Sequence, residues 1–327
     1  MNLYRGRMPK VNPLVIAIDI GGTNLRAAFV DRDGRIFGRE RLVTLLTRNG
    51  LITQLADVIR RMKAKDKRVC AAGIGFPGPM KIDQGIVLTP PNIPDCANLP
   101  LKKILERATN LPVFLENDAN AAALGEYWIG AAEGAESMVC ITLGTGIGGG
   151  IVLNGKVWHG AGDVAGELGH MTVRPGGRMC GCGKRGCIET YASASGVART
   201  ARAKIQRNKH SAILALAGGK ASAITSAIVY QAAMRGDVIA GKVLEETGRI
   251  LGMAIGNLLN ILNPAMVVLT GGLARAGRLL FDPLRAEVPK HCFPAAFRGT
   301  RIVPGKLGDD AGMAGAALSA FQKMKNS

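Results

Sequence analysis

The chain has 327 residues, of which 44 are glycine and only 4% are aromatic, and its formal net charge is +18. This length suits one large or two medium domains, and the many glycines and small aliphatic residues favour an α/β enzyme over a β-sandwich. Lysine and arginine are scattered along the chain and few aromatic side chains could stack on bases, so we expect no nucleic-acid partner. Attraction for anionic substrates such as nucleotide phosphates is a milder consequence of the charge.

The cysteine content and the absence of targeting features indicate the compartment. Seven cysteines are an odd number and no secretory signal is evident, which together favour a reducing cytoplasm. The most apolar later segment, residues 250–262, carries Asn257 and Asn260 and is too short to span a bilayer. We therefore expect a cytoplasmic protein with no membrane partner.

Three short strands are predicted near the start of the chain, over residues 14–19, 25–30 and 35–39. The turn Gly21-Gly22-Thr23-Asn24 joins the first two, and Asp33-Gly34 between the second and third is a hairpin signal. After them we predict an amphipathic helix over residues 51–63, a buried strand over 69–75, a second helix over 101–109 and a strand over 111–115. An alanine-rich helix then continues to about residue 127. A loop-rich stretch at residues 79–99 contains Pro90-Pro91-Asn92.

The second half of the chain repeats the opening order of strands and turns. Strands predicted over residues 137–143, 148–153 and 156–159 are joined by Gly144-Thr145-Gly146 and by Asn154-Gly155. This succession predicts an internal duplication whose halves meet near residue 130, and hence domains at residues 1–130 and 131–327. Further helices are predicted over residues 190–207, 224–235, 240–262 and 309–321, and a strand over residues 266–270 opens into Gly271-Gly272.

Three glycine-rich turns follow strands, in the segments DIGGTN, LGTGIGG and VVLTGG. Such turns let backbone N–H groups approach phosphate oxygens because no Cβ intervenes. The spacing of these glycines matches neither a dinucleotide-binding fingerprint nor a P-loop. Each turn taken alone is most simply a plain hairpin or loop. Three of them in a duplicated chain favour a nucleotide clamp.

Residues 166–189 hold the least ordinary chemistry of the chain. His170, Cys180, Cys182 and Cys187 stand in the pattern H-x9-C-x-C-x4-C, with glycines between the sulfurs. Zinc takes four nitrogen or sulfur ligands tetrahedrally, and thiolates with one neutral imidazole satisfy it, so the pattern favours a structural Zn²⁺. A disulfide would leave one of the three sulfurs unpaired and would strain a C-x-C bridge. Unliganded cysteines in a glycine-rich loop are the remaining alternative.

Two carboxylates bracket this stretch, Glu167 just before the cysteines and Glu189 just after them. Beside a metal and loop backbone, they are well placed to accept hydrogen bonds from a polyhydroxylated ligand. The alternative is a helix-start carboxylate for Glu189 and a solvated loop charge for Glu167.

Taken together, the motifs resemble those of sugar kinases of the ROK family, in the actin/hexokinase/acetate-kinase superfamily. The resemblance covers nearly the whole chain, through DIGGTN, GIGFPGP, PPNIP, LENDANAAALGE, LGTGIGGG, GELGH, CGCGKRGCIE and VVLTGG. It implies an α/β, two-domain, actin-like ATPase (ribonuclease H-like) fold, with a duplicated mixed sheet flanked by helices, closing over a cleft for ATP and a sugar. It also implies transfer of the γ-phosphoryl group of ATP to a hexose hydroxyl, usually at C6.

The resemblance assigns roles to sugar-site residues. The END motif places the catalytic base at Asp118, whose alternative role is a helix N-cap. The same resemblance implies that the sugar is bound by Asn117, Glu167, His170 and Glu189, and by Gly78 and Asn92 at the remaining sugar-loop positions. His170 then has two roles, because one ring nitrogen binds zinc while the other donates to or accepts from a sugar hydroxyl.

The nucleotide site follows from the same resemblance. The phosphates are expected at two turns, with Gly271 and Gly272 near the adenosine. Asp19, which is otherwise a charged strand-end residue, is expected beside the phosphates and the Mg²⁺ that accompanies ATP. The turn residues assigned to the phosphates are Gly21, Gly22, Thr23, Asn24, Gly144, Thr145, Gly146 and Gly148.

The intact set of sugar and catalytic residues most resembles the glucokinases of the family. Kinases for fructose, mannose, N-acetylglucosamine and N-acetylmannosamine share nearly all of it, and a sugar-sensing regulator without turnover is a third class. The family's repressors carry an N-terminal helix-turn-helix module, whereas about a dozen residues precede the first predicted strand here, so we expect a kinase. The family often forms dimers or tetramers, and we expect a homo-oligomer.

Overall fold

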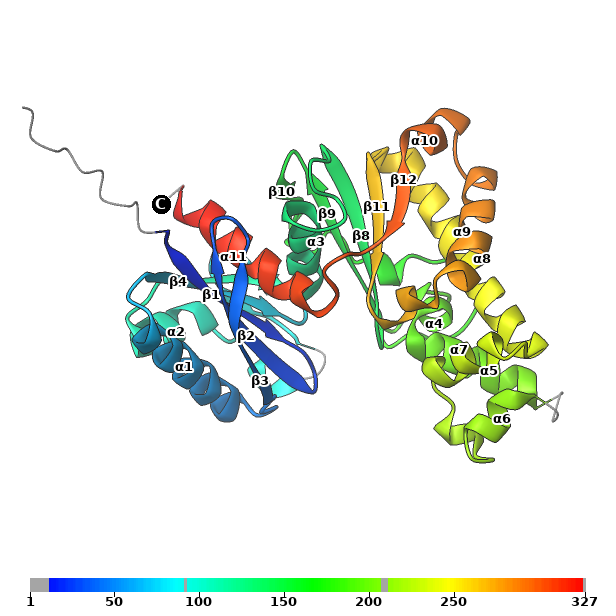
Figure 1. The fold of residues 1–327 in the computed structure, drawn as a ribbon, viewed down its shortest axis with the longest axis horizontal. Coiled ribbons are helices and arrows are strands. Elements are labelled where there is room, and N and C mark those ends of the chain that lie inside the picture. The colour runs from blue at the N-terminus through cyan, green and yellow to red at the C-terminus, as the bar shows by residue number, and fades with distance from the viewer. Residues whose placement is uncertain (1–11, 91–92, 207–210, 326–327) are drawn as a thin grey trace, which may run out of the picture. The chain divides into compact units, whose positions relative to one another are not determined.

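The computed structural model describes residues 12–90, 93–206 and 211–325 and divides into two units (Figure 1). Unit 1 comprises the chain up to Trp128 together with the residues from Asp310 onward, and unit 2 comprises Ile129–Asp309. The predicted second domain, residues 131–327, therefore differs from the structure at its end. The last helix, α11 (Ala311–Met324), packs in unit 1.

Unit 1 is built on a mixed sheet of five strands. Its order is β3-β2-β1-β4-β7, with β1 antiparallel to β2 and parallel to β4, and with β4 parallel to β7. The Asp33-Gly34 turn between β2 and β3 is present, with Gly34 at φ 79°. The strands are β1 (Leu14–Ile20), β2 (Asn24–Asp31), β3 (Ile36–Val43), β4 (Val69–Phe76) and β7 (Val113–Asn117).

The two faces of this sheet are covered by different helices (Figure 1). Along β1, Ile16 and Ile18 belong to a core with α1 (Arg48–Lys65) and α2 (Leu101–Thr109). Val15 and Ala17 alternate with them and pack against α11 on the other face. This alternation follows from the two-residue period of a strand. A small hairpin of β5 (Met80–Lys81) and β6 (Ile86–Val87) and a short 3₁₀ helix, Pro94–Cys96, occupy the loop-rich stretch.

Helix α11 lies unusually close to α3 (Asp118–Trp128) and β4 because glycines face carbonyl oxygens at the contacts. A Cβ on Gly315 would overlap with the carbonyl oxygen of Ala121, and one on Gly125 with that of Ala311. A Cβ on Gly73 of β4 would likewise overlap with the carbonyl oxygen of Ala316. Backbone cannot move aside as a side chain does, so these glycines determine that α11 completes unit 1.

Replacing Gly315 with alanine should destabilise the protein by about 3 kcal/mol, because the added methyl group must push α11 away from α3. Chemical denaturation followed by circular dichroism measures this effect. The matched control is Gly241→Ala in α8 (Val238–Leu262), where no described heavy atom lies within 4 Å of an added Cβ. That substitution should be neutral or stabilising by up to about 1 kcal/mol. Equal effects of the two substitutions would contradict the packing argument.

Unit 2 repeats the sheet of unit 1, in the order β10-β9-β8-β11-β12. Strand β8 is antiparallel to β9 and parallel to β11, and β11 is parallel to β12, so the two sheets share one pairing pattern, in agreement with the predicted duplication. The Asn154-Gly155 turn has both residues in the left-handed region, at φ 51° and 77°. The strands are β8 (Ser137–Leu143), β9 (Ile147–Leu153), β10 (Lys156–Val157), β11 (Met266–Thr270) and β12 (Arg301–Pro304).

Most of the unit 2 core lies between its sheet and a layer of helices centred on α8. The helix predicted over residues 190–207 is broken at Ser193, whose side chain accepts from the Gly196 N–H and caps the second piece. Helix α8 ends as predicted, at Asn263 in the left-handed region. The others are α4 (Glu189–Ala192), α5 (Ala194–Ile205), α6 (Ala212–Leu216), α7 (Ser226–Met234), α9 (Arg278–Glu287) and α10 (Pro294–Gly299). Within the described ranges, no helix has the length and apolar character required to cross a membrane.

Candidate functional site

The predicted catalytic residues of unit 1 lie at one edge of its sheet. Strands β1, β4 and β7 are parallel, so their carboxyl ends meet at the same edge. The register pairs Asp19 with Gly75 and Gly75 with Glu116, and it pairs Phe76 with Asn117. Asp19 near the end of β1 and Asn117 at the end of β7 therefore lie at the same sheet edge with β4 between them, and Asp118 directly follows β7.

The chain turns from strand to helix at Asn117 and Asp118. The Asn117 side-chain oxygen accepts from the N–H groups of Ala119 (3.0 Å) and Asn120 (3.1 Å), so Asn117 caps α3. An Asp118 carboxylate oxygen accepts from the Ala119 N–H at 2.9 Å. The Asn117 amide nitrogen donates to the Gly78 carbonyl at 3.3 Å. Two predicted sugar residues are thus in direct contact; Asn92, predicted beside them, lies outside the described residues.

Glu116, to which the sequence motifs assigned no role, is buried and forms hydrogen bonds with this turn. It is 1% exposed, and one carboxylate oxygen accepts from the Asn117 N–H (3.1 Å) and the Asn120 amide (3.4 Å). The other oxygen accepts from the Ser319 hydroxyl of α11 at 3.3 Å. A buried carboxylate needs such partners, and here they join the turn at Asn117 and Asp118 to α11. The sequence feature that could have indicated this role is a glutamate at the end of an apolar strand.

Asp19 lies against the first turn of α11. Its carboxylate is 3.5 Å from the Arg26 guanidinium. A Cβ on Gly312 would lie 2.7 Å from the Asp19 carboxyl carbon, so only glycine leaves room for this approach. The positive end of a helix stabilises a carboxylate at its first turn.

The two turns predicted to hold phosphates are closed by their own backbone. In the first, the Gly21 N–H donates to Asn24 (2.9 Å) and the Thr44 hydroxyl donates to the Gly21 carbonyl (2.8 Å). In the second, the Gly144 N–H donates to Gly146 at 3.0 Å. The tips of both turns are exposed, at Gly22, Thr23, Gly144 and Thr145. Short closed turns with exposed tips suit contact with a phosphate chain.

A cavity of about 280 Å³ opens beside the second turn. Gly271, which follows β11, has a φ of 94° and lies against the end of β8. A Cβ on Gly271 would lie 2.6 Å from the Leu143 carbonyl oxygen, so the close contact requires glycine. Sequence reasoning missed the cavity, because its walls come from helix starts with no motif beyond small and hydroxyl residues. Its lining includes Thr145, Ala194, Ser195, Arg202, Thr225 and Ser226.

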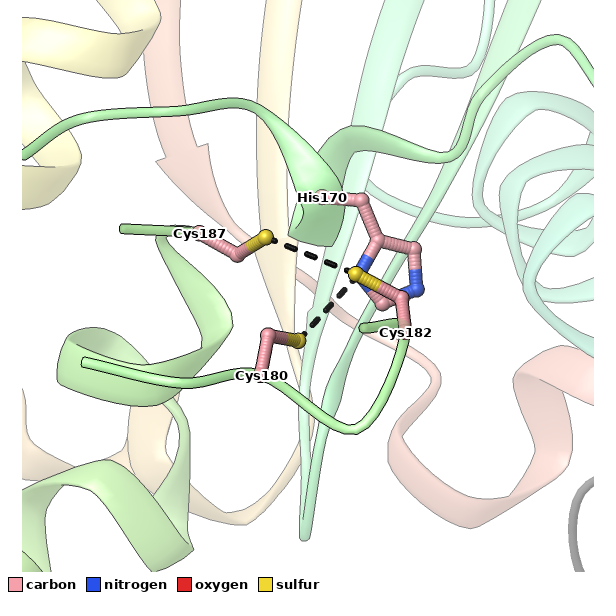
Figure 2. A group of neighbouring side chains, drawn as sticks. All are labelled: His170, Cys180, Cys182 and Cys187. Carbon is pink, nitrogen blue, oxygen red and sulfur yellow. Dashed lines mark hydrogen bonds between the residues drawn. The ribbon is translucent and has the colours of Figure 1, made fainter. Parts of the chain in front are cut away.

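The four predicted metal ligands converge in unit 2, as Figure 2 shows. Their ligand atoms all lie within 4.8 Å of one another, with Cys182 and Cys187 sulfurs 3.6 Å apart and the Cys180 sulfur 3.7 Å from Nδ1 of His170. Tetrahedral bonds of about 2.3 Å would separate two sulfurs by about 3.8 Å. Each of the seven cysteines, all in the described part of the chain, is free of disulfide bonds. The geometry fits one metal ion.

The chemistry of the thiols also fits a cation. Burial, together with the neighbouring thiols Cys182 and Cys180, raises the pKa of Cys187 to about 12. Burial likewise raises the pKa of Cys180, whereas a hydrogen bond from the Lys184 backbone lowers the pKa of the exposed Cys182. Three thiolates in such proximity require a positive charge, which a divalent metal supplies as it displaces the protons.

The two flanking carboxylates contact this cluster differently. Glu167 lies 3.8 Å from Nε2 of His170, the ring nitrogen that faces away from the sulfurs. Glu189 begins α4, and its Oε1 accepts from the Cys180 thiol at 3.7 Å. The structure thus brings together His170, Glu167, Glu189 and the cysteines, as the sequence predicts.

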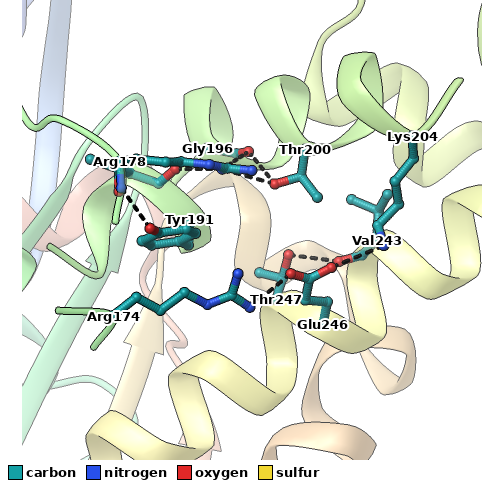
Figure 3. Close-up of polar contacts among 10 residues, drawn as sticks. Arg174, Arg178, Tyr191, Gly196, Thr200, Lys204, Val243, Glu246 and Thr247 are labelled. Carbon is teal, nitrogen blue, oxygen red and sulfur yellow. Dashed lines mark hydrogen bonds and ion pairs between the residues drawn. The ribbon is translucent and has the colours of Figure 1, made fainter. Parts of the chain in front are cut away.

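An aromatic ring held between two guanidinium groups anchors the loop of the four predicted metal ligands, residues 166–189 (the metal loop), to the helices (Figure 3). The Arg174 and Arg178 guanidinium carbons lie 4.8 and 4.6 Å from the Tyr191 ring centre. Arg178 also donates to the Thr190 carbonyl (2.8 Å), and Arg174 pairs with Glu246 of α8 (2.9 Å). These cation–π contacts and hydrogen bonds fix α4 relative to α5 and α8.

Comparison with known proteins identifies the family. The ROK family model matches residues 15–323. A glucokinase of Halalkalibacterium halodurans is 41% identical over 307 residues, spanning 92% of each chain. The crystal structure of a ROK family glucokinase from Streptomyces griseus in complex with glucose and AMPPNP has a TM-score of 0.82 at 37% identity, covering 94% of this chain and 99% of that chain. An N-acetylmannosamine kinase of Shigella flexneri is 36% identical, covering 94% of this chain and 98% of that enzyme. The chain belongs to the ROK family.

Proposed function

We propose that this protein is an ATP-dependent glucokinase that transfers the γ-phosphoryl group of ATP to the C6 hydroxyl of glucose. The observation that carries the proposal is Asp118 at the carboxyl end of β7, in a chain 41% identical to a glucokinase over nearly its full length. Both the predicted sugar residues and the two glycine turns are intact in the same chain. A solved relative with glucose and AMPPNP supports the two substrates.

Each unit contributes its own residues to the proposed reaction. In unit 1, Asp118 would accept the proton of the attacking hydroxyl while Asn117 binds the sugar. Residues 21–24 would contact the phosphates, and Asp19 would bind the Mg²⁺ that neutralises them. In unit 2, residues 144–148 would contact the phosphates, and Glu167, His170 and Glu189 would accept or donate hydrogen bonds to sugar hydroxyls.

We assign the metal of the Cys/His cluster as Zn²⁺, held by Nδ1 of His170 and the sulfurs of Cys180, Cys182 and Cys187. Four protein ligands fill a tetrahedral site, so the ion would order the loop and would not activate water. Ligation through Nδ1 leaves Nε2 of His170 available for a sugar hydroxyl. Support comes from the convergence of the four ligand atoms.

We place the adenosine of ATP in the 280 Å³ cavity beside Thr145. The Arg202 guanidinium holds one wall in place, because it donates to the carbonyls of Ala221 (3.0 Å), Ser222 (3.2 Å) and Ile224 (2.8 Å). Small residues at the start of α5 leave room for a purine, and hydroxyl groups at the start of α7 suit a ribose or base edge.

A panel of hexoses with ATP tests the proposal, with ADP release coupled to an indicator reaction. Glucose should give the highest kcat/KM among glucose, fructose, mannose, N-acetylglucosamine and N-acetylmannosamine. A higher kcat/KM for N-acetylmannosamine, the substrate named for one relative, would overturn the choice of sugar. Absence of ADP release with every hexose would overturn the kinase assignment and favour a sugar-sensing regulator.

A further inference from the structure

We propose that Glu189 is a positioning residue that ties the second phosphate turn to the metal loop, so that nucleotide binding depends on the metal site. The inference rests on the proposed function, since it takes residues 144–148 as the turn that contacts the nucleotide phosphates. Beyond binding sugar, Glu189 would hold the turn in position. Its two carboxylate oxygens face different partners, one on the turn and one at the metal site.

The carboxylate of Glu189 bridges two sites. Its Oε2 accepts from the backbone N–H of Ile147 at 2.9 Å, at the residue where the turn passes into β9. Its Oε1 lies 3.7 Å from the Cys180 sulfur, and Glu189 follows the metal ligand Cys187 by two residues. A Cβ on Gly146 would overlap with Oε2, so the turn approaches the carboxylate as closely as glycine permits. One half-buried side chain thus connects a metal ligand to the phosphate turn.

Backbone contacts strengthen the same connection. The Ala194 N–H, at the start of α5, donates to the Gly144 carbonyl at 2.9 Å. On the other side, a Cβ on Gly169 would overlap with the Ile147 carbonyl oxygen, and one on Gly149 would lie 2.5 Å from that of Gly166. Gly169 directly precedes the metal ligand His170. The start of β9 is therefore contacted by both ends of the metal loop.

The other end of this link is rigid. Glu189 and Tyr191 share the single turn of α4, and Tyr191 is held between Arg174 and Arg178 (Figure 3). Burial alone would raise the pKa of Glu246, but hydrogen bonds from Lys204 and Arg174 outweigh it and lower this pKa. The ion pair of Arg174 with Glu246 attaches the loop to α8. Because these contacts hold α4, the Glu189 carboxylate helps to fix the position of the Ile147 N–H.

This coupling predicts an effect that a sugar ligand alone would not produce. Without any sugar, Glu189→Ala should weaken binding of AMPPNP with Mg²⁺ about tenfold, equivalent to about 1.4 kcal/mol. Glu189→Gln should restore most of the affinity, because its amide oxygen can accept from the Ile147 N–H. Isothermal titration calorimetry on the full chain, with metal content verified, provides the measurement.

The matched control is Glu167→Ala, which removes the other carboxylate of the same loop. Among the described residues, Glu167 contacts Nε2 of His170 and forms no hydrogen bond with residues 144–148, so the AMPPNP affinity should match that of the wild type. Metal depletion of the wild type should weaken AMPPNP binding by a similar factor to Glu189→Ala. Depletion of the Glu189→Ala variant should then add little, since the link is already absent.

The outcomes separate this inference from the proposed function. If the wild type binds AMPPNP and both Glu189→Ala and metal depletion leave the affinity unchanged, the coupling is wrong and the kinase proposal stands. If the wild type does not bind AMPPNP at all, the nucleotide part of the proposed function is wrong. Should Glu189→Ala fail to fold by circular dichroism, metal depletion of the wild type decides, and an unchanged affinity overturns the inference.

Discussion

Replacing Asp118 with asparagine should lower kcat for glucose phosphorylation by about 10²–10⁴-fold, the range by which a positioned general base accelerates proton transfer. Asparagine has the same shape as aspartate, and its side-chain oxygen can still accept from the Ala119 N–H, which Asp118 accepts at 2.9 Å. It cannot take the proton of the sugar hydroxyl. The fold and the glucose Kd should therefore stay close to those of the wild type.

Steady-state kinetics and glucose titration by calorimetry separate these effects. The control is Asp57→Asn, which alters an exposed aspartate of α1 and should leave kcat unchanged. A kcat within threefold of the wild type for Asp118→Asn would refute the catalytic role. Loss of glucose binding with normal folding would instead identify Asp118 as a sugar ligand.

Replacing Cys182 with serine should remove the metal and raise the KM for glucose. A serine hydroxyl is a poor substitute for a thiolate. Loss of a residue that hydrogen-bonds to a metal ligand can weaken metal binding by roughly 100-fold, so loss of the ligand itself should weaken it by more. Cys182 is exposed, so the substitution leaves no cavity in the core. Metal analysis should find about one zinc per wild-type chain and almost none in the variant.

Cys292→Ser is the matched control for this experiment. The Cys292 thiol lies outside the cluster and donates to the Val288 carbonyl at 3.3 Å, a bond that serine can also make. Its zinc content and glucose KM should equal those of the wild type. An unchanged zinc content in Cys182→Ser would show that the four converging side chains do not hold the ion.

Elements with strong local signals were predicted with their observed bounds. The helix at residues 101–109 and the strands at 137–143 and 266–270 agree with α2, β8 and β11. Helix α2 ends at Asn110 in the left-handed region, a stop that a single residue encodes. The Asn154-Gly155 turn is similar, since both residues tolerate positive φ.

Other elements depended on partners that are distant in sequence. No strand was predicted at residues 301–304, because β12 is short, ends in Pro304 and exists as the parallel neighbour of β11. The break at Ser193 was missed because serine is tolerated inside helices as well as at their caps. The buried position of Glu116 could not be read from its own segment, since one of its partners, Ser319, comes from the far end of the chain.

The candidate site shows the same division. The pattern of His170 with three cysteines predicted a metal cluster whose ligand atoms do converge, and DIGGTN and LGTGIGG predicted turns after strands, which are present. The cavity beside Thr145 was not predicted, because its walls join residues from three separate segments. The contact of Glu189 with Ile147 was also not predicted, since it requires the packing of α4 against the turn.

The sequence by itself determined the family and the repeated strand order, and it predicted the Cys/His cluster and the candidate site residues, because these depend on residue types at short spacing. Only the tertiary structure decided that α11 returns to unit 1, which of Asn117 and Asp118 makes the principal cap, and that the Glu189 carboxylate accepts from the Ile147 N–H. Those features depend on close contacts between distant segments, such as Gly315 with Ala121 and Gly146 with Glu189, where steric fit determines the outcome.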